Sequence, residues 1–134
     1  MRLLGIDYGI KKIGLSFGDS DAKVAVPLEV ISNRGEETLK ELADRVRADD
    51  IGLVVVGVPL YRGGHHGPEQ LDATREFIKK LRAVLPVDVV EEDESFTTSE
   101  SIRLQKEEGS TVPEDALAAM LILQSFFDRT KEVL

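Results

Sequence analysis

Residues 51–59, with the sequence IGLVVVGVP, form an uninterrupted apolar run rich in β-branched side chains. A strand without alternating polar residues is typical of one buried on both faces of a sheet. Such a strand needs helices on both sides, and amphipathic segments at residues 36–48 and 69–84 flank the run. This segment therefore predicts an α/β fold in which residues 51–59 form a central strand.

The other segments predict how the sheet is built. Residues 2–31 hold three short strand patterns, typical of an antiparallel meander, and Gly9 in the first turn can take a positive φ. Later strands alternate with helices, so we expect them to be parallel. We predict one domain, residues 1–134, with a five-stranded mixed sheet flanked by helices. The predicted strands are residues 2–7, 13–18, 24–31, 51–59 and 87–90, and the predicted helices are 36–48, 69–84, 97–108 and a last one opening at 111–114.

Two capping boxes predict where the last helices begin. Thr97 is followed three residues later by Glu100, and Thr111 by Glu114. In this motif the threonine is the N-cap and the glutamate occupies N3. Gly109 is expected to end the first of the two helices.

The composition limits the class of protein. The 134 residues include no cysteine, which excludes a disulfide framework, a thiol nucleophile and a cysteine zinc site, and favours a cytoplasmic location. No export signal is expected, and the longest apolar run is far shorter than the roughly 18 residues that span a bilayer. The net charge of −8, from 17 basic and 25 acidic residues, argues against coating nucleic acid through bulk positive charge. The net charge does not exclude local basic patches on the surface.

Two aspartates stand where an apolar element ends or begins. Asp7 ends the first strand, at the carboxyl edge where open α/β sheets usually bind ligands. Asp115 lies in the first turn of an apolar helix and shares a face with Ala118, Ala119 and Ile122. Each has a simpler explanation. Asp7 can be a turn aspartate that caps backbone amides, and Asp115 can be a first-turn acid favoured by the helix dipole.

Four consecutive acids, residues 91–94, follow the last predicted strand. Strand alternation places Glu92 and Glu94 on one side and Glu91 and Asp93 on the other, so only one side can join Asp7. A solvated strand end is the simpler interpretation. If the acids converge, their oxygens suit Mg²⁺ or Mn²⁺, and such a centre suits phosphodiester hydrolysis with one or two ions.

The basic and histidine residues in the turns are candidate contacts to substrate phosphates. Lys11 and Lys12 lie in the first hairpin, and Arg62, His65 and His66 lie in a glycine-rich loop. The adjacent histidines lack further ligands for zinc, and the loop does not match a P-loop. Solvated side chains are the alternative for all five residues.

Taken together, the motifs resemble the YqgF/RuvX family, described as Holliday-junction-resolvase-like proteins or pre-16S rRNA nucleases with an RNase H-like fold. The resemblance covers nearly the whole chain. The motifs that carry it are LGIDYG at 4–9, KIGLS at 12–16, VGVPL at 56–60, DESFTT at 93–98 and DALAA at 115–119.

The resemblance implies a divalent-metal-dependent endonuclease with Asp7, Glu94 (or neighbouring Asp93) and Asp115 as its acids. It implies structured nucleic acid as the partner, either precursor rRNA or branched DNA, and a monomer or homodimer. Ser95 replaces an arginine that is common in the family, and Arg62 or Arg103 could supply the missing contact. The alternative function is a nucleic-acid-binding or regulatory module that keeps the fold without catalysis.

Overall fold

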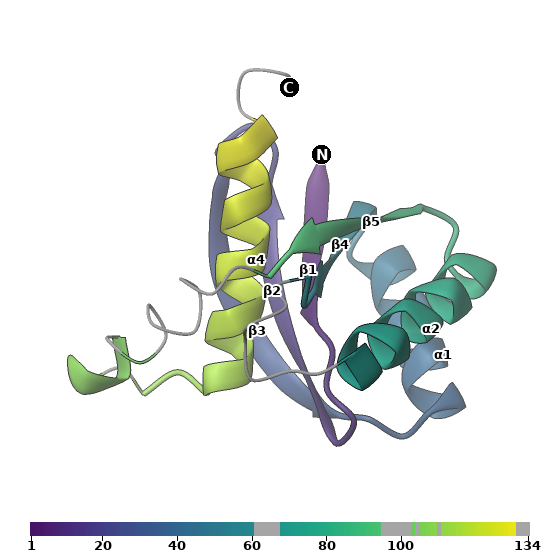
Figure 1. The fold of residues 1–134 in the computed structure, drawn as a ribbon. Helices are drawn as coiled ribbons and strands as arrows, with labels where there is room; N and C mark the ends of the chain where they lie inside the picture. The colour runs from purple at the N-terminus through teal and green to yellow at the C-terminus, as the bar shows by residue number, and fades with distance from the viewer. Residues whose placement is uncertain (61–67, 95–102, 104, 110, 131–134) are drawn as a thin grey trace.

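The computed structural model describes residues 1–60, 68–94, 103, 105–109 and 111–130, and Figure 1 shows their arrangement. The strands are β1 (Arg2–Asp7), β2 (Lys12–Asp19), β3 (Val24–Ser32), β4 (Ile51–Val58) and β5 (Asp88–Asp93). The helices are α1 (Glu36–Ala48), α2 (Pro68–Val84) and α4 (Glu114–Thr130). Residues 103 and 105–107 are also helical, but most of the helix predicted at 97–108 lies outside the described residues.

The sheet has the order β3-β2-β1-β4-β5. Strands β1, β2 and β3 pair as an antiparallel meander, whereas β4 is parallel to both β1 and β5. The predicted mixed sheet is therefore confirmed, and β4 is an interior strand. Because β1, β4 and β5 are parallel, their carboxyl ends, Asp7, Val58 and Asp93, meet at one edge of the sheet.

Helices cover the two faces of the sheet unequally. Helices α1 and α2 lie on one face and α4 crosses the other, as Figure 1 shows. Successive residues of β1 serve the two faces, since Leu4 and Ile6 pack in the core under α1 and α2, whereas Leu3 packs in the core under α4. Asp7 therefore belongs to the face that α4 covers.

Helix α4 approaches the sheet closely because glycines lie beneath it. A Cβ at Gly5 would overlap the Ser16 hydroxyl and come within 2.9 Å of Leu123 Cβ. The buried Ser16 hydroxyl donates a hydrogen bond of 2.6 Å to the Ala119 carbonyl, which fastens the helix to β2. Gly57 on β4 leaves similar room for the Ile122 side chain.

The predicted first hairpin is present, and the predicted capping box at Thr111 is wrong. Gly9 does not adopt a left-handed conformation; a side chain there would overlap the Lys12 carbonyl, so the turn needs glycine for space. The capping box with Thr111 as N-cap is not formed, because α4 begins only at Glu114 and its first helical bond runs from the Leu117 amide to the Pro113 carbonyl. Proline disfavours a helical conformation at the preceding residue, so the helix cannot start at residue 112.

Within the described ranges, no helix has the length and apolar character needed to cross a membrane.

We expect Gly5→Ala to destabilise the protein by about 2 kcal/mol or more, because the added methyl group must displace α4. Gly52→Ala is the matched control, since a Cβ there meets chiefly the flexible end of Met1, at 2.7 Å from its Cγ. Urea unfolding measures both variants. Equal losses of stability would show that the close approach of α4 is not the constraint described here.

Candidate active site

The position of Asp115 depends on a glycine opposite Asp7. Asp7 pairs with Gly14 across the antiparallel β1–β2 ladder, so both residues present the same face to α4. A Cβ on Gly14 would overlap the Asp115 carbonyl oxygen and lie 3.0 Å from the Ala116 amide nitrogen. The first turn of α4 can therefore rest directly on β2 beside Asp7. This contact brings the two aspartates, 108 residues apart in the sequence, to one place.

Glu94 reaches Asp7 from two strands away. The Glu94 amide donates a hydrogen bond of 2.8 Å to the Val58 carbonyl, which holds it at the end of β4. Gly57 lies on the α4-covered face of β4, so no β4 side chain occupies that position. The Glu94 carboxyl group makes a hydrogen bond with that of Asp7. The carboxyl group that reaches Asp7 from this side thus comes from the residue after β5, the residue that the family resemblance implies.

The environment of Asp7 raises the pKa of its carboxyl group from 3.8 to about 8. Burial is the main cause, followed by the negative charges of Glu94 and Asp115 and by the hydrogen bond with Glu94. With a pKa of about 8, the Asp7 carboxyl group keeps its proton at neutral pH and can donate it to Glu94. This is a site where negative charge is concentrated and a cation would be stabilised.

The four consecutive acids are separated by their partners. Glu91 forms an ion pair of 3.4 Å with Arg75 of α2, on one face of the sheet. Glu92, only 4% exposed, accepts hydrogen bonds from the Arg129 guanidinium at 2.7 and 3.0 Å. The predicted alternation is confirmed, and Asp93 is exposed on the side opposite Glu94. Of the two acids considered as the second ligand, the structure brings Glu94 to Asp7.

The contact of Glu92 with Arg129 and Ser125 was missed by the sequence analysis. The Ser125 hydroxyl donates to Glu92 at 3.0 Å, and the guanidinium of Arg129 also lies 5.6 Å from the centre of the Phe126 ring. These groups join β5 to α4, the two elements that carry Glu94 and Asp115. Two features of the sequence could have indicated this contact. Glu92 is an acid at an inward position of β5, and Ser125 and Arg129 are polar residues four apart on α4.

The remaining candidates are placed as follows. Lys11 is exposed in the β1–β2 turn and Lys12 is exposed at the start of β2, at the edge of the sheet where β1 ends. Arg103 forms an exposed ion pair of 3.7 Å with Glu107. The predicted phosphate contacts Arg62, His65 and His66 lie outside the described residues.

The donor set fits a hard divalent cation. Within the described residues, no three acidic or histidine side chains are already arranged as a metal-binding group. Asp7 is nevertheless partly buried and in electrostatic contact with two further carboxyl groups. Carboxylate oxygens are the ligands that Mg²⁺ and Mn²⁺ prefer, and binding a cation here would replace the proton of Asp7.

Comparison with known proteins identifies the family. A family model described as "RuvX: Holliday junction resolvase" matches residues 1–129. The chain belongs to the RuvX family. A protein of Sulfurihydrogenibium sp. (strain YO3AOP1), named "Putative pre-16S rRNA nuclease", is 36% identical over 133 residues, covering 96% of this chain and 90% of the relative. A protein of Methylocella silvestris with the same name is 35% identical and covers 98% of this chain.

A solved structure shows the same fold. The structure titled "T. thermophilus RuvC in complex with Holliday junction substrate" matches with a TM-score of 0.58 at 17% identity, covering 97% of this chain and 96% of that one. The fold is thus RNase H-like. Membership of the RuvX family makes the chain a nuclease, a hydrolase of phosphodiester bonds, and implies dependence on a divalent metal.

We expect Asp7→Asn to stabilise the metal-free protein at neutral pH. The pKa of Asp7 is about 8 in the fold against an ordinary value of 3.8. The contribution of its carboxyl group to the free energy of unfolding is therefore full below pH 3.8 and is lost as the pH rises toward 8. Asparagine avoids this loss, and the advantage of the variant should grow with pH to about 1–3 kcal/mol.

Thermal unfolding in EDTA at several pH values measures this difference. The control is Asp88→Asn, at the exposed start of β5, which should show no such trend. A difference between Asp7→Asn and the unsubstituted protein that stays constant from pH 4 to pH 8 would contradict the raised pKa of Asp7.

Proposed function

We propose that the protein is an endonuclease that uses Mg²⁺ or Mn²⁺ held by Asp7, Glu94 and Asp115 to cut structured nucleic acid. The observation that carries this proposal is the meeting of the three carboxyl groups, from β1, the end of β5 and the start of α4. We propose that Asp93, being exposed on the other side of β5, acts at most through a water molecule.

The residues of the site have separate roles in this proposal. A bound divalent ion would supply a more acidic water and neutralise charge at the scissile phosphate. Asp7 and Glu94 would hold the ion through their carboxylate oxygens once the proton of Asp7 had passed to solvent water. Asp115, fixed by the contact of its backbone with Gly14, holds the third position. Lys11 and Lys12 bind phosphates of the strand beside the site, and we assign the same role to Arg62, His65 and His66.

Two kinds of nucleic acid fit the family. The relatives' name points to precursor 16S rRNA, and the family description points to the Holliday junction. A homodimer would carry two sites related by a two-fold axis, which suits symmetric cuts in a junction, whereas a monomer suffices for trimming an RNA end. We propose that the 134 residues work as one domain in the cytoplasm.

A second candidate function is a nucleic-acid-binding module without catalysis. It is favoured by the hydrogen bond between the Asp7 and Glu94 carboxyl groups, in which each carboxyl group is the other's partner. If this hydrogen bond outcompetes metal at cellular concentrations, the fold would bind nucleic acid without cutting it.

The test incubates the protein with a precursor 16S rRNA 5′ segment and with a four-way DNA junction, in Mn²⁺ or EDTA. We expect metal-dependent cleavage of at least one substrate, reduced about 100-fold or more in Asp7→Asn and Asp115→Asn. The control is Glu91→Gln, which removes an acid from the same run but on the opposite face, beside Arg75. Cleavage that survives in Asp7→Asn would overturn the assignment, and binding of both substrates without cleavage would establish the second candidate.

A further inference from the structure

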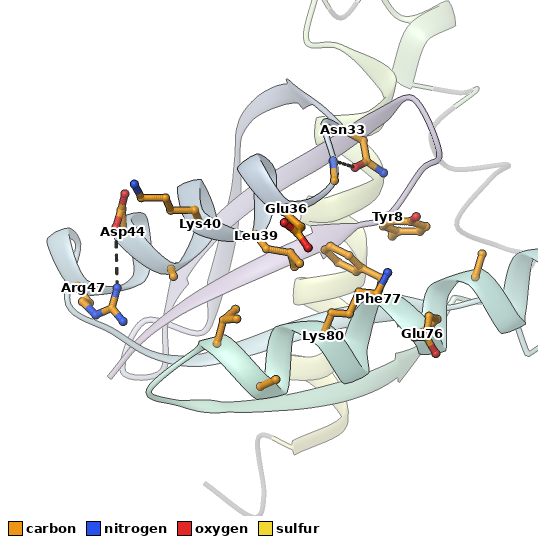
Figure 2. Close-up of a pocket in the computed structure, with 15 residues that line it drawn as sticks. Tyr8, Asn33, Glu36, Leu39, Lys40, Asp44, Arg47, Glu76, Phe77 and Lys80 are labelled. Atoms are coloured by element: carbon orange, nitrogen blue, oxygen red, sulfur yellow. Dashed lines mark hydrogen bonds and ion pairs between the residues drawn. The ribbon is translucent and has the colours of Figure 1, made fainter.

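A cavity of about 900 Å³ lies between α1 and α2, on the face of the sheet opposite α4. Its volume is typical of sites that hold a small ligand. Figure 2 shows the Tyr8 and Phe77 rings at one end of the cavity and Arg47 toward the other. None of the residues assigned to the metal site lines it. The fold therefore contains a second concave site that hydrolysis does not explain.

The cavity begins at the residue next to Asp7. Tyr8 packs with the core under α1 and α2, whereas Asp7 belongs to the face that α4 covers. The two side chains therefore leave the same edge of the sheet in opposite directions. The Tyr8 ring stacks on Phe77 of α2, with ring centroids 4.4 Å apart and an interplanar angle of 28°. A nucleic-acid strand that crosses this edge at Asp7 would place an adjacent nucleotide at an aromatic surface.

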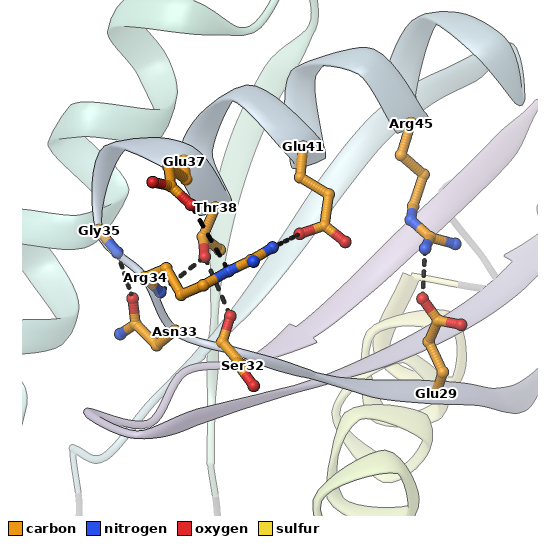
Figure 3. Close-up of polar contacts among 9 residues, drawn as sticks. All are labelled: Glu29, Ser32, Asn33, Arg34, Gly35, Glu37, Thr38, Glu41 and Arg45. Carbon is orange, nitrogen blue, oxygen red and sulfur yellow. Dashed lines mark hydrogen bonds and ion pairs between the residues drawn. The ribbon is translucent and has the colours of Figure 1, made fainter.

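The walls of the cavity are held in place by polar contacts. Figure 3 shows that the Thr38 hydroxyl donates to the Ser32 carbonyl and accepts from the Arg34 amide, at 3.0 and 2.8 Å. The Asn33 side-chain amide donates to the Gly9 carbonyl at 2.9 Å, which ties the start of α1 to the β1–β2 turn. On the other wall, Arg82 of α2 donates to the Val89 carbonyl at 2.9 Å. The cavity is thus preformed.

The charges around the cavity suit a nucleotide. Figure 2 shows the Lys80 ammonium group at the aromatic end, beside Phe77, whereas that of Lys40 points toward Asp44 at the end that holds Arg47. An ammonium group placed as that of Lys80 is can bind phosphate. Glu36 and Glu76 also line the cavity without ion pairs among the described residues, and carboxylates accept hydrogen bonds from exocyclic amino groups of bases. The partly buried Leu39 and the Tyr8 ring, which Phe77 supports from behind, provide the apolar surface on which a base can stack.

We propose that the cavity between α1 and α2 receives one nucleotide of the bound strand, adjacent to the phosphate that lies at Asp7. This inference rests on the proposed function, because it takes the strand to cross the sheet edge at Asp7. The nucleotide stacks its base at the aromatic end, directs an amino edge to Glu36 and places its phosphate against the Lys80 ammonium group. The cavity then sets which unpaired nucleotide next to the cut is accepted.

The test measures binding of a short single-stranded RNA that carries one 2-aminopurine, by fluorescence in EDTA, where no cleavage occurs. We expect Lys80→Glu to weaken binding about tenfold. The matched control is Lys79→Glu, which makes the same charge change at the exposed neighbouring position that does not line the cavity. Ala73→Leu fills the cavity without changing charge and should remove the fluorescence change; circular dichroism verifies that each variant is folded.

Equal effects of Lys80→Glu and Lys79→Glu, with Ala73→Leu binding as the unsubstituted protein does, would overturn the proposal. A second arm titrates cytidine monophosphate and follows the amide resonances of α1 and α2 by NMR. If the mononucleotide shifts these resonances and the RNA does not, the cavity serves a free nucleotide and the proposal is wrong. Loss of RNA binding that is confined to the cavity variants supports the nucleotide site even if no metal activates cleavage. The nucleotide site and the proposed nuclease activity can therefore be contradicted independently of each other.

Discussion

Helix α4 lies so close to the sheet that side chains cannot fit beneath it at the glycines of β1, β2 and β4. Gly14 is decisive, because a methyl group there would overlap the Asp115 carbonyl oxygen. The buried hydrogen bond from Ser16 to Ala119 fixes the same approach one turn further along the helix. The placement of Asp115 beside Asp7 thus follows from backbone contact rather than from any attraction between the two acids, which repel each other.

This packing sets the electrostatics of the edge. Each acid of residues 91–94 that lies against a helix has an arginine partner, Arg75 for Glu91 and Arg129 for Glu92. Glu94 instead meets Asp7, whose burial forces a proton to remain at neutral pH. Each of these two acids thus has an arginine beside it, whereas the Asp7 carboxyl group meets two further carboxyl groups. A divalent cation is the natural partner for the group that is left.

Local patterns predicted the sheet well because β1, β4 and the amphipathic helices carry clear periodicity. The alternation of residues 91–94 also predicted that Glu92 and Glu94 share a face, although only the family resemblance pointed to Glu94 as the acid near Asp7. Other features depend on contacts between distant residues. Strand β5 runs on to Asp93, beyond the predicted end at residue 90, because Arg129, 37 residues from Glu92, neutralises that acid. The cavity arises from how two helices diverge, which no single segment encodes.

The most direct test of the account is a crystal structure of the protein with Mn²⁺ at pH 8, with data collected for the anomalous signal of manganese. The account predicts an anomalous peak bounded by the carboxylates of Asp7, Glu94 and Asp115, with the hydrogen bond between Asp7 and Glu94 broken. A folded protein in which that hydrogen bond persists under saturating Mn²⁺, with manganese bound only elsewhere, would contradict it.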